Sequence, residues 1–109
     1  MRLRWLKLGT RSLRVIHAHI AADNPQAAKY VVQRIHEATR RLSQFPNSGR
    51  PGKVAGTREL VLPHWPYIVV YRVMSDEVQI LRAFHGATDW WNARSQIGTD
   101  ASEAGDTDA

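Results

Sequence analysis

The sequence predicts one small domain of the α+β class, with two helices on one side of an antiparallel sheet. Three observations lead to this prediction. The chain has 109 residues, which is the length of one compact domain. Apolar residues recur at helical spacing through residues 10–45, and strand-like runs dominate residues 57–84. The connections between those runs are short, which favours antiparallel pairing.

A short strand and a helix are expected at the beginning of the chain. Residues 2–6 alternate between charged and apolar side chains, as a half-buried strand does. A helix is expected over residues 10–22, because its apolar side chains are spaced by three and four: Leu13, Ile16 and Ile20.

A second helix is expected directly after the first. Asn24 is a favourable N-cap residue, and Pro25 suits the first position of a helix. Apolar residues then keep helical spacing as far as residue 45. Because the break between the two helices is short, we expect them to form an antiparallel hairpin.

The second half of the chain predicts a loop and three strands. Residues 45–52 are rich in Pro and Gly and predict a loop that ends near Gly56. Three strand-like runs follow and predict an antiparallel meander: 57–62, 67–74 and 77–84.

The end of the chain differs in composition from the rest. Residues 87–95 are expected to form a terminal turn or helix. Residues 96–109 are small, polar and acidic, and we expect a disordered tail there. This division predicts a folded domain at residues 1–95 and an acidic tail at residues 96–109.

The charge indicates an anionic partner. The chain has 15 Lys and Arg residues against 10 Asp and Glu residues, a formal net charge of +5. Residues 96–109 have four acidic residues and no basic one, so residues 1–95 carry +9. Arginine supplies most of this excess, and its planar fork of donors suits phosphate and carboxylate groups. We expect a nucleic acid, an acidic protein segment or both as partners.

Several classes of function are disfavoured. The absence of cysteine excludes disulfides, a thiol nucleophile and a cysteine zinc site. Histidines and carboxylates are not spaced as metal ligands or as a catalytic carboxylate pair, so we expect neither a metal nor a cofactor. The N-terminal segment lacks the apolar stretch of a signal peptide, and no run approaches a bilayer span of about 20 residues. We therefore expect a cytoplasmic protein.

The predicted register brings two arginines together. If Ser75-Asp76 is a tight turn and residues 63–66 are a loop, Leu60, Val69 and Arg82 form one row across the meander. Arg58 and Arg82 then share the face away from the helices with Tyr67 and Tyr71. The opposite face, with Val61, Ile68, Val70, Leu81 and Ala83, is expected to hold the helices. A slip of one residue in either turn would separate the arginines.

Three further residues are candidates for function. His85 follows the last strand, where it could act as a general acid or base or simply bond the backbone of a turn. Arg50 and Lys53 lie in a glycine-containing basic loop. Such a loop suits a phosphate contact, although an ordinary basic turn has the same composition.

Four segments together resemble a known family. They are Phe45-Pro46-x-Ser48-Gly49-Arg50-Pro51-Gly52, Gly56-Thr57-Arg58-Glu59-Leu60, Pro66-Tyr67-Ile68-Val69-Val70-Tyr71-Arg72-Val73 and Ile80-Leu81-Arg82-x-x-His85-Gly86. In this order and spacing they resemble the RelE/ParE superfamily of toxins, over about residues 1–91. The resemblance implies a toxin of a type II toxin–antitoxin pair. We expect its cognate antitoxin to fold an acidic, partly disordered segment onto the basic domain.

The superfamily has two kinds of target. RelE-like members cleave mRNA in the ribosomal A site, whereas ParE-like members poison DNA gyrase. For a cleaving member, the resemblance implies that Arg58 and Arg82 stabilise the phosphorane. His85 would act as acid or base, with Tyr71 as a weaker candidate. Arg50 or Lys53 would hold the RNA backbone, without a metal or cofactor.

One departure from the family bears on this choice. Cleaving members often have an arginine at the start of the third strand, where Pro66-Tyr67-Ile68 stands here. The sequence nevertheless favours a ribosome-dependent mRNA endoribonuclease, because His85 and the arginines could perform that chemistry. A toxin that inhibits DNA gyrase is the alternative, and a protein that only binds its antitoxin is the third interpretation.

Overall fold

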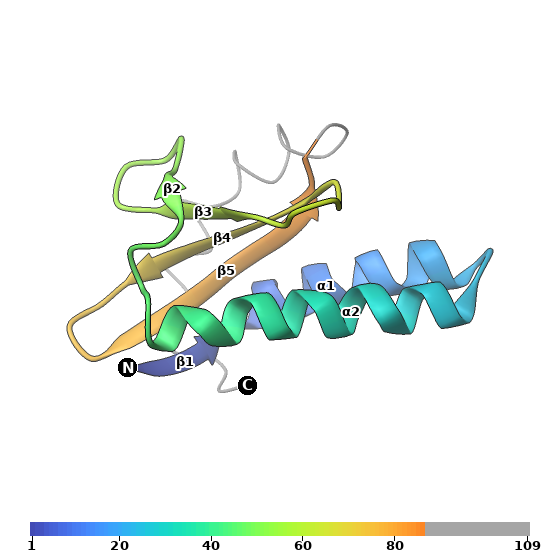
Figure 1. The fold of residues 1–109 in the computed structure, drawn as a ribbon, viewed down its shortest axis with the longest axis horizontal. Helices are drawn as coiled ribbons and strands as arrows, with labels where there is room; N and C mark the ends of the chain where they lie inside the picture. The colour runs from blue at the N-terminus through green and yellow to red at the C-terminus, as the bar shows by residue number, and fades with distance from the viewer. Residues whose placement is uncertain (87–109) are drawn as a thin grey trace.

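The computed structural model describes residues 1–86. The turn or helix expected at residues 87–95 and the acidic tail expected at residues 96–109 lie outside the described residues. A five-stranded sheet has two antiparallel helices on one side (Figure 1), so the predicted α+β class is confirmed. Within residues 1–86, no helix has the length and apolar character needed to cross a bilayer.

The sheet has the order β1-β5-β4-β3-β2, with β1 parallel to β5 and the other neighbours antiparallel. The predicted N-terminal strand, helix hairpin and meander are confirmed. Strand β2 was not predicted, because its Pro- and Gly-rich surroundings indicated a loop. The elements are β1 (Arg2–Trp5), α1 (Lys7–Ala21), α2 (Pro25–Arg40), the 3-10 turn η1 (Arg41–Ser43), β2 (Arg50–Pro51), β3 (Arg58–Val61), β4 (Tyr67–Val73) and β5 (Glu77–His85).

The helix hairpin forms as the sequence predicts. The side-chain oxygen of Asn24 accepts a hydrogen bond from the Ala27 amide at 3.1 Å, and Pro25 opens α2. Helix α1 begins at Lys7, earlier than predicted. Its first turn lies close to β5. A Cβ atom on Gly9 would lie only 2.6 Å from the Ile80 carbonyl oxygen. A glycine at this position therefore permits the close helix–sheet contact.

The register of the meander differs from the prediction at one place. The pairs Arg58–Tyr71 and Tyr71–Ile80 are formed as expected. An irregularity between Val70 and Tyr71 then shifts the pairing, so that Arg82 lies opposite Val70 and not opposite Val69. In the predicted row Leu60–Val69–Arg82, the pair Leu60–Val69 is confirmed and the position of Arg82 was wrong. A bulge places an extra residue in β5, which moves the side chains that follow it relative to β4.

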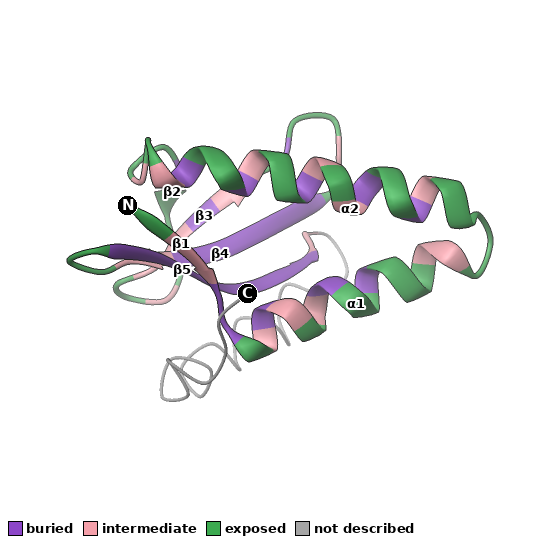
Figure 2. Ribbon diagram, turned by 90° about the horizontal axis from the view of Figure 1, so that it is seen from below, coloured by how far each residue is buried: buried purple, intermediate pink, exposed green. Residues whose placement is uncertain are grey.

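The helices cover the face of the sheet that was predicted to be open. The larger buried cluster joins strand residues such as Val69, Tyr71 and Ile80 to the inward residues of both helices. Ile68, Val70 and Leu81 belong instead to a second cluster with Leu6 and Phe84. In Figure 2, burial extends along β4 and β5 and along the inward stripes of the helices. Both faces are apolar at their centres, so strand alternation alone does not distinguish them.

Candidate functional site

Tyr71 and Arg58 hold the loop that precedes β2. The Tyr71 side chain is fully buried. Its hydroxyl donates to the Pro46 carbonyl at 2.7 Å and accepts from the Gly49 amide at 2.9 Å. The Arg58 guanidinium donates to the Gly49 carbonyl at 2.7 Å. The Tyr71 hydroxyl and one nitrogen of the Arg58 guanidinium thus form hydrogen bonds that position the loop.

Arg82 lies on the other face of the sheet from Arg58. Its cross-strand neighbour Val70 belongs to the second cluster, whereas Tyr71, the neighbour of Arg58, packs beneath the helices. Arg82 is 9% exposed, and it donates to the Leu8 carbonyl in the first turn of α1 at 3.2 Å. The predicted arginine pair is therefore not formed, because the bulge in β5 changes the face on which Arg82 lies.

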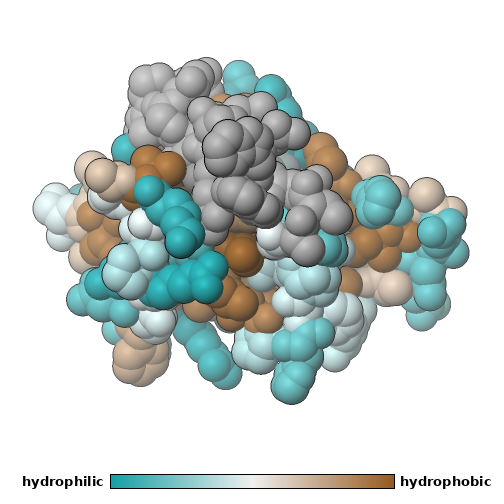
Figure 3. Space-filling view, turned by 90° about the horizontal axis from the view of Figure 1, so that it is seen from above, coloured by the Kyte–Doolittle hydropathy of each residue, from teal (hydrophilic) through white to brown (hydrophobic). Residues whose placement is uncertain are grey.

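The face of the sheet opposite to the helices is seen in Figure 3. Where the picture leaves this face uncovered, hydrophilic side chains lie beside several separate hydrophobic areas. Arg50 and Glu59 are cross-strand neighbours, and Glu59 pairs in turn with Val70 of the second cluster. Cross-strand neighbours share a face. This side of the sheet therefore contains both the Arg50–Glu59 ion pair, of which only the carboxylate is buried, and Arg82.

Arg50 is paired with a buried carboxylate. Its Nη2 and Nε atoms lie 3.0 and 3.2 Å from Oε1 of Glu59, whose side chain is 2% exposed. The charge of Arg50 is thus balanced within the fold. Lys53, on the loop between β2 and β3, is exposed and makes no ion pair within residues 1–86. Of the two basic-loop residues, Lys53 alone presents an unbalanced charge to solvent.

His85 ends β5 at a distance from the other predicted catalytic residues. It is half-buried, it pairs with Tyr67, and the two rings meet edge to face with centroids 5.7 Å apart. Arg58 pairs with Tyr71, so four residues of β4, about 13 Å, separate the two rows. An acid–base group must lie within about 3 Å of the proton it transfers, or act through one water. The rows that contain His85 and Arg58 are therefore not adjacent along β4.

A buried carboxylate that sequence reasoning missed joins the first strand to the last. Glu77 accepts hydrogen bonds from the side chains of Gln79 and Arg4, and Arg2 lies 3.7 Å away. The bond from Gln79 and the charges of Arg4 and Arg2 outweigh burial and hold the pKa of Glu77 below its usual value. The alternating arginines of β1 were the available signal, since a basic side chain on a strand is stabilised by an acidic residue on the neighbouring strand.

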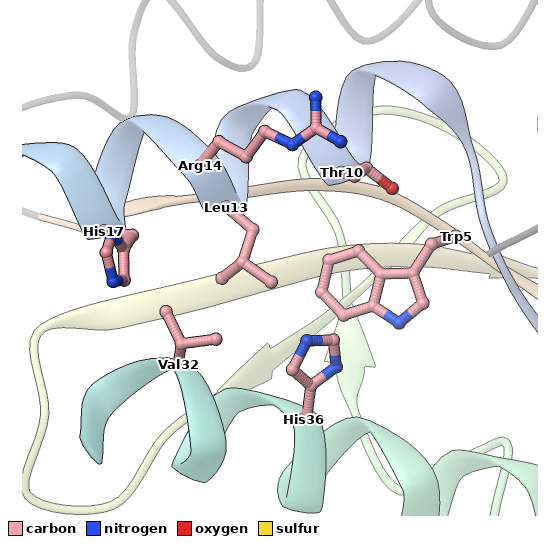
Figure 4. Close-up of a pocket in the computed structure, with 7 residues that line it drawn as sticks. All are labelled: Trp5, Thr10, Leu13, Arg14, His17, Val32 and His36. Atoms are coloured by element: carbon pink, nitrogen blue, oxygen red, sulfur yellow. The ribbon is translucent and has the colours of Figure 1, made fainter. Parts of the chain in front are cut away.

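A cavity of about 340 Å³ opens between the two helices (Figure 4). Leu13 and Val32 face each other across it, and the Trp5 ring lies 5.2 Å from the His36 ring between centroids. Burial, and then the charge of Arg40, lower the pKa of His36. The cavity is lined by Trp5, Thr10, Leu13, Arg14, His17, Val32 and His36. An apolar floor with a basic rim suits an apolar side chain that has acidic neighbours.

A second cavity, of about 350 Å³, lies between α2 and the β3–β4 connection. The Tyr30 and Trp65 rings lie 5.7 Å apart between centroids, and the Arg34 guanidinium lies 5.0 Å from the Tyr30 centroid. Neither cavity contains a predicted catalytic residue. Among the described residues, no three His, Asp or Glu side chains are grouped to hold a metal ion.

Three comparisons place the chain among known proteins. The model of the family described as the ParE toxin of the type II toxin–antitoxin system parDE matches residues 3–90. A protein of Sinorhizobium fredii named as a candidate toxin, Y4kP, is 46% identical over 89 residues, which are 82% of this chain and 92% of that protein. A solved structure of the chromosomal ParDE system from P. aeruginosa has a TM-score of 0.73 and 36% identity, and the match covers 78% of this chain and 95% of that one. The chain therefore belongs to the ParE family of toxins of type II toxin–antitoxin systems.

Proposed function

We propose that this toxin inhibits DNA gyrase and is neutralised by a cognate antitoxin. The observation that carries the proposal is the separation of Arg58 from Arg82 by the thickness of the sheet. Membership of the ParE family supports the same target, since ParE-like members poison gyrase. Inhibition of gyrase needs a recognition surface, and it requires no proton transfer by the toxin.

Cleavage of mRNA would need a different arrangement. Attack of the 2′-hydroxyl on the neighbouring phosphate requires a base, an acid and cationic groups around one phosphorus atom. Tyr71 and Arg58 bind the loop before β2, Arg82 binds the start of α1, and His85 packs on Tyr67. These contacts support structural roles for the four residues and favour the gyrase target over the endoribonuclease that the sequence alone favoured.

The antitoxin is proposed to be an acidic protein segment that folds on the toxin. The excess of +9 over residues 1–95 attracts such a segment. The cavity between α1 and α2 offers an apolar floor at Leu13 and Val32 with Arg14 at its rim. An apolar side chain flanked by carboxylates fits this combination, because it fills the floor while its neighbours meet the basic charge.

Two assays test the proposal, one with the purified toxin and one in cells that express it. In a supercoiling assay, we expect loss of gyrase activity as toxin is added. In primer extension of mRNA after induction, we expect no new ends within codons. Folded His85→Ala protein should inhibit gyrase as the wild type does. Cleavage of mRNA that His85→Ala reduces by about 10²–10⁴ would overturn the proposal and identify a cleaving enzyme.

A further inference from the structure

The second cavity, of about 350 Å³, lies beside α2 and apart from the cavity between the two helices. It is formed by α2, η1 and the connection between β3 and β4, and we call it the β3–β4 cavity. In Figure 2 this connection lies beside α2, on the side away from α1. Six of the side chains that line the cavity bear on what it binds: Tyr30, Arg34, Glu37, Arg41, Leu62 and Trp65.

The walls of the β3–β4 cavity are aromatic rings with a guanidinium group beside them. The Tyr30 and Trp65 rings are 5.7 Å apart between centroids, and the Arg34 guanidinium lies 5.0 Å from the Tyr30 centroid. Leu62 is buried and adds an apolar surface between the strands and α2. Tyr, Trp and Arg are the side chains that most often dominate the binding energy of protein–protein interfaces. This composition therefore favours a protein partner.

Two features of the β3–β4 cavity work against the stability of the fold. The Nε atom of Arg34 is buried and has no hydrogen-bond partner among the described residues, and such a donor is destabilising. His64 has a φ of 68°, in the left-handed region that residues other than glycine adopt uncommonly. Conformations of this kind cluster at binding sites, and local arrangements that oppose folding indicate a role in function. Because Pro63 and Pro66 fix φ on either side of the turn, Trp65 is presented by a preorganised loop.

The charge around the β3–β4 cavity is nearly balanced. Glu37 pairs with Arg34 at 2.7 Å, so Arg41 is the one charged side chain of its lining that makes no ion pair within residues 1–86. The cavity between α1 and α2 differs, because its lining contains Arg14 and no acidic residue. A segment attracted by charge therefore fits the cavity between the helices better. The β3–β4 cavity fits an apolar or aromatic side chain with one acceptor oxygen beside it.

We propose that the β3–β4 cavity is the surface through which the toxin contacts gyrase, and that it receives an apolar or aromatic side chain of that enzyme. The inference rests on the proposed gyrase target. Arg34 is two residues from both Val32 and His36, about half a helical turn, so the two cavities lie on different sides of α2. An antitoxin seated between the helices would lie about one helix width, roughly 10 Å, from the β3–β4 cavity. That separation is small enough for a bound antitoxin to exclude a large enzyme.

A supercoiling assay with purified gyrase and purified toxin variants tests the inference. We expect Tyr30→Ala and Trp65→Ala to raise the toxin concentration needed for half inhibition about 5–30-fold, as the loss of a dominant interface side chain does. Arg41→Ala should raise it as well, because the acceptor oxygen loses its cation. Lys29→Ala and Arg40→Ala are the matched controls, since these exposed neighbours line neither cavity, and they should inhibit as the wild type does. Circular dichroism checks the folding of each variant, and Tyr30→Ala decides if Trp65→Ala does not fold.

The outcomes separate this inference from the proposed function. Wild-type toxin that leaves gyrase unaffected would overturn both. Normal inhibition by the wild type and equal inhibition by folded Tyr30→Ala would overturn the assignment of the cavity and leave the gyrase target in place.

Polyglutamate serves as a probe for an acidic antitoxin segment. It should bind Tyr30→Ala and Trp65→Ala as it binds the wild type, because both variants keep the charge of the toxin. Weaker binding of polyglutamate to these variants, together with unchanged inhibition of gyrase, would overturn the inference and assign the β3–β4 cavity to the antitoxin.

Discussion

The guanidinium of Arg50 reaches across the β2–β3 pair to the Glu59 carboxylate at 3.0 Å. The two side chains differ in environment, since Arg50 is 53% exposed and Glu59 is 2% exposed. The contact fastens the short edge strand β2 to the sheet. It also supplies charge-assisted hydrogen bonds to a buried carboxylate, and such bonds are among the stronger ones in proteins.

Replacement of Arg50 should therefore destabilise the fold. We expect Arg50→Ala to lower the free energy of unfolding by about 1–3 kcal/mol, because a buried carboxylate loses two donors. Urea denaturation followed by circular dichroism measures the change. Arg41→Ala, at an exposed position, should stay within about 0.5 kcal/mol of the wild type. Equal losses of unfolding free energy in the two variants would show that the ion pair stabilises the fold no more than an exposed arginine does.

Removal of the Tyr71 hydroxyl tests its structural role. Tyr71→Phe leaves the Gly49 amide and the Pro46 carbonyl without this partner, so we expect a loss of about 1–3 kcal/mol in the free energy of unfolding. Tyr30→Phe, at a position that is 47% exposed, is the matched control and should change little. If Tyr71→Phe unfolds at the wild-type urea concentration, the hydroxyl does not stabilise the loop.

The ion-pair cluster at Glu77 should make stability depend on acidic pH. Because its pKa is lower in the folded protein, its contribution is complete above the ordinary glutamate value of 4.5 and is lost as pH falls through the folded value. Glu77→Gln should therefore be less stable than the wild type at neutral pH, and the difference should shrink in acid. Urea titrations of both proteins across this range measure it. A constant difference at every pH would contradict the assignment.

The imidazole of His36 should titrate with a pKa below the ordinary histidine value of 6.5. The folded protein disfavours protonation of His36. The free energy of unfolding should therefore fall as pH drops from the ordinary histidine pKa toward the lower pKa of the folded protein. NMR titration of the ring protons measures the pKa directly. Arg40→Gln should raise it part of the way, because burial is the larger cause and Arg40 the smaller. An unchanged value in Arg40→Gln would remove Arg40 from the explanation.

Local signals in the sequence were enough to predict much of the fold. Asn24 and Pro25 define the break between the helices, and the β3–β4 register follows from the length of the loop between those strands. The face that receives the helices could not be predicted from alternation, because Val69 and Val70 are both fully buried. Strand β2 was hidden because Pro51 lacks an amide hydrogen and usually indicates a loop.

The candidate site was less predictable than the fold, because it depended on the β4–β5 register. No residue between Val70 and Arg82 indicates that a bulge is present. The extra residue in β5 moves Arg82 to the face opposite Arg58. Glu77 was missed for a different reason. Its neighbours Arg2 and Arg4 come from the other end of the described chain, so the contact requires knowledge of the parallel β1–β5 pairing.

That parallel pairing also sets an order on synthesis. β1 leaves the ribosome first, but the strand on which it pairs is the last strand of the sheet. The helix hairpin has local contacts and can form early, whereas closure of β1 on β5 is the most non-local pairing in the domain. The complete sheet therefore assembles only when the residues of β5, which ends at His85, have been translated, so a nascent chain truncated before β5 lacks it.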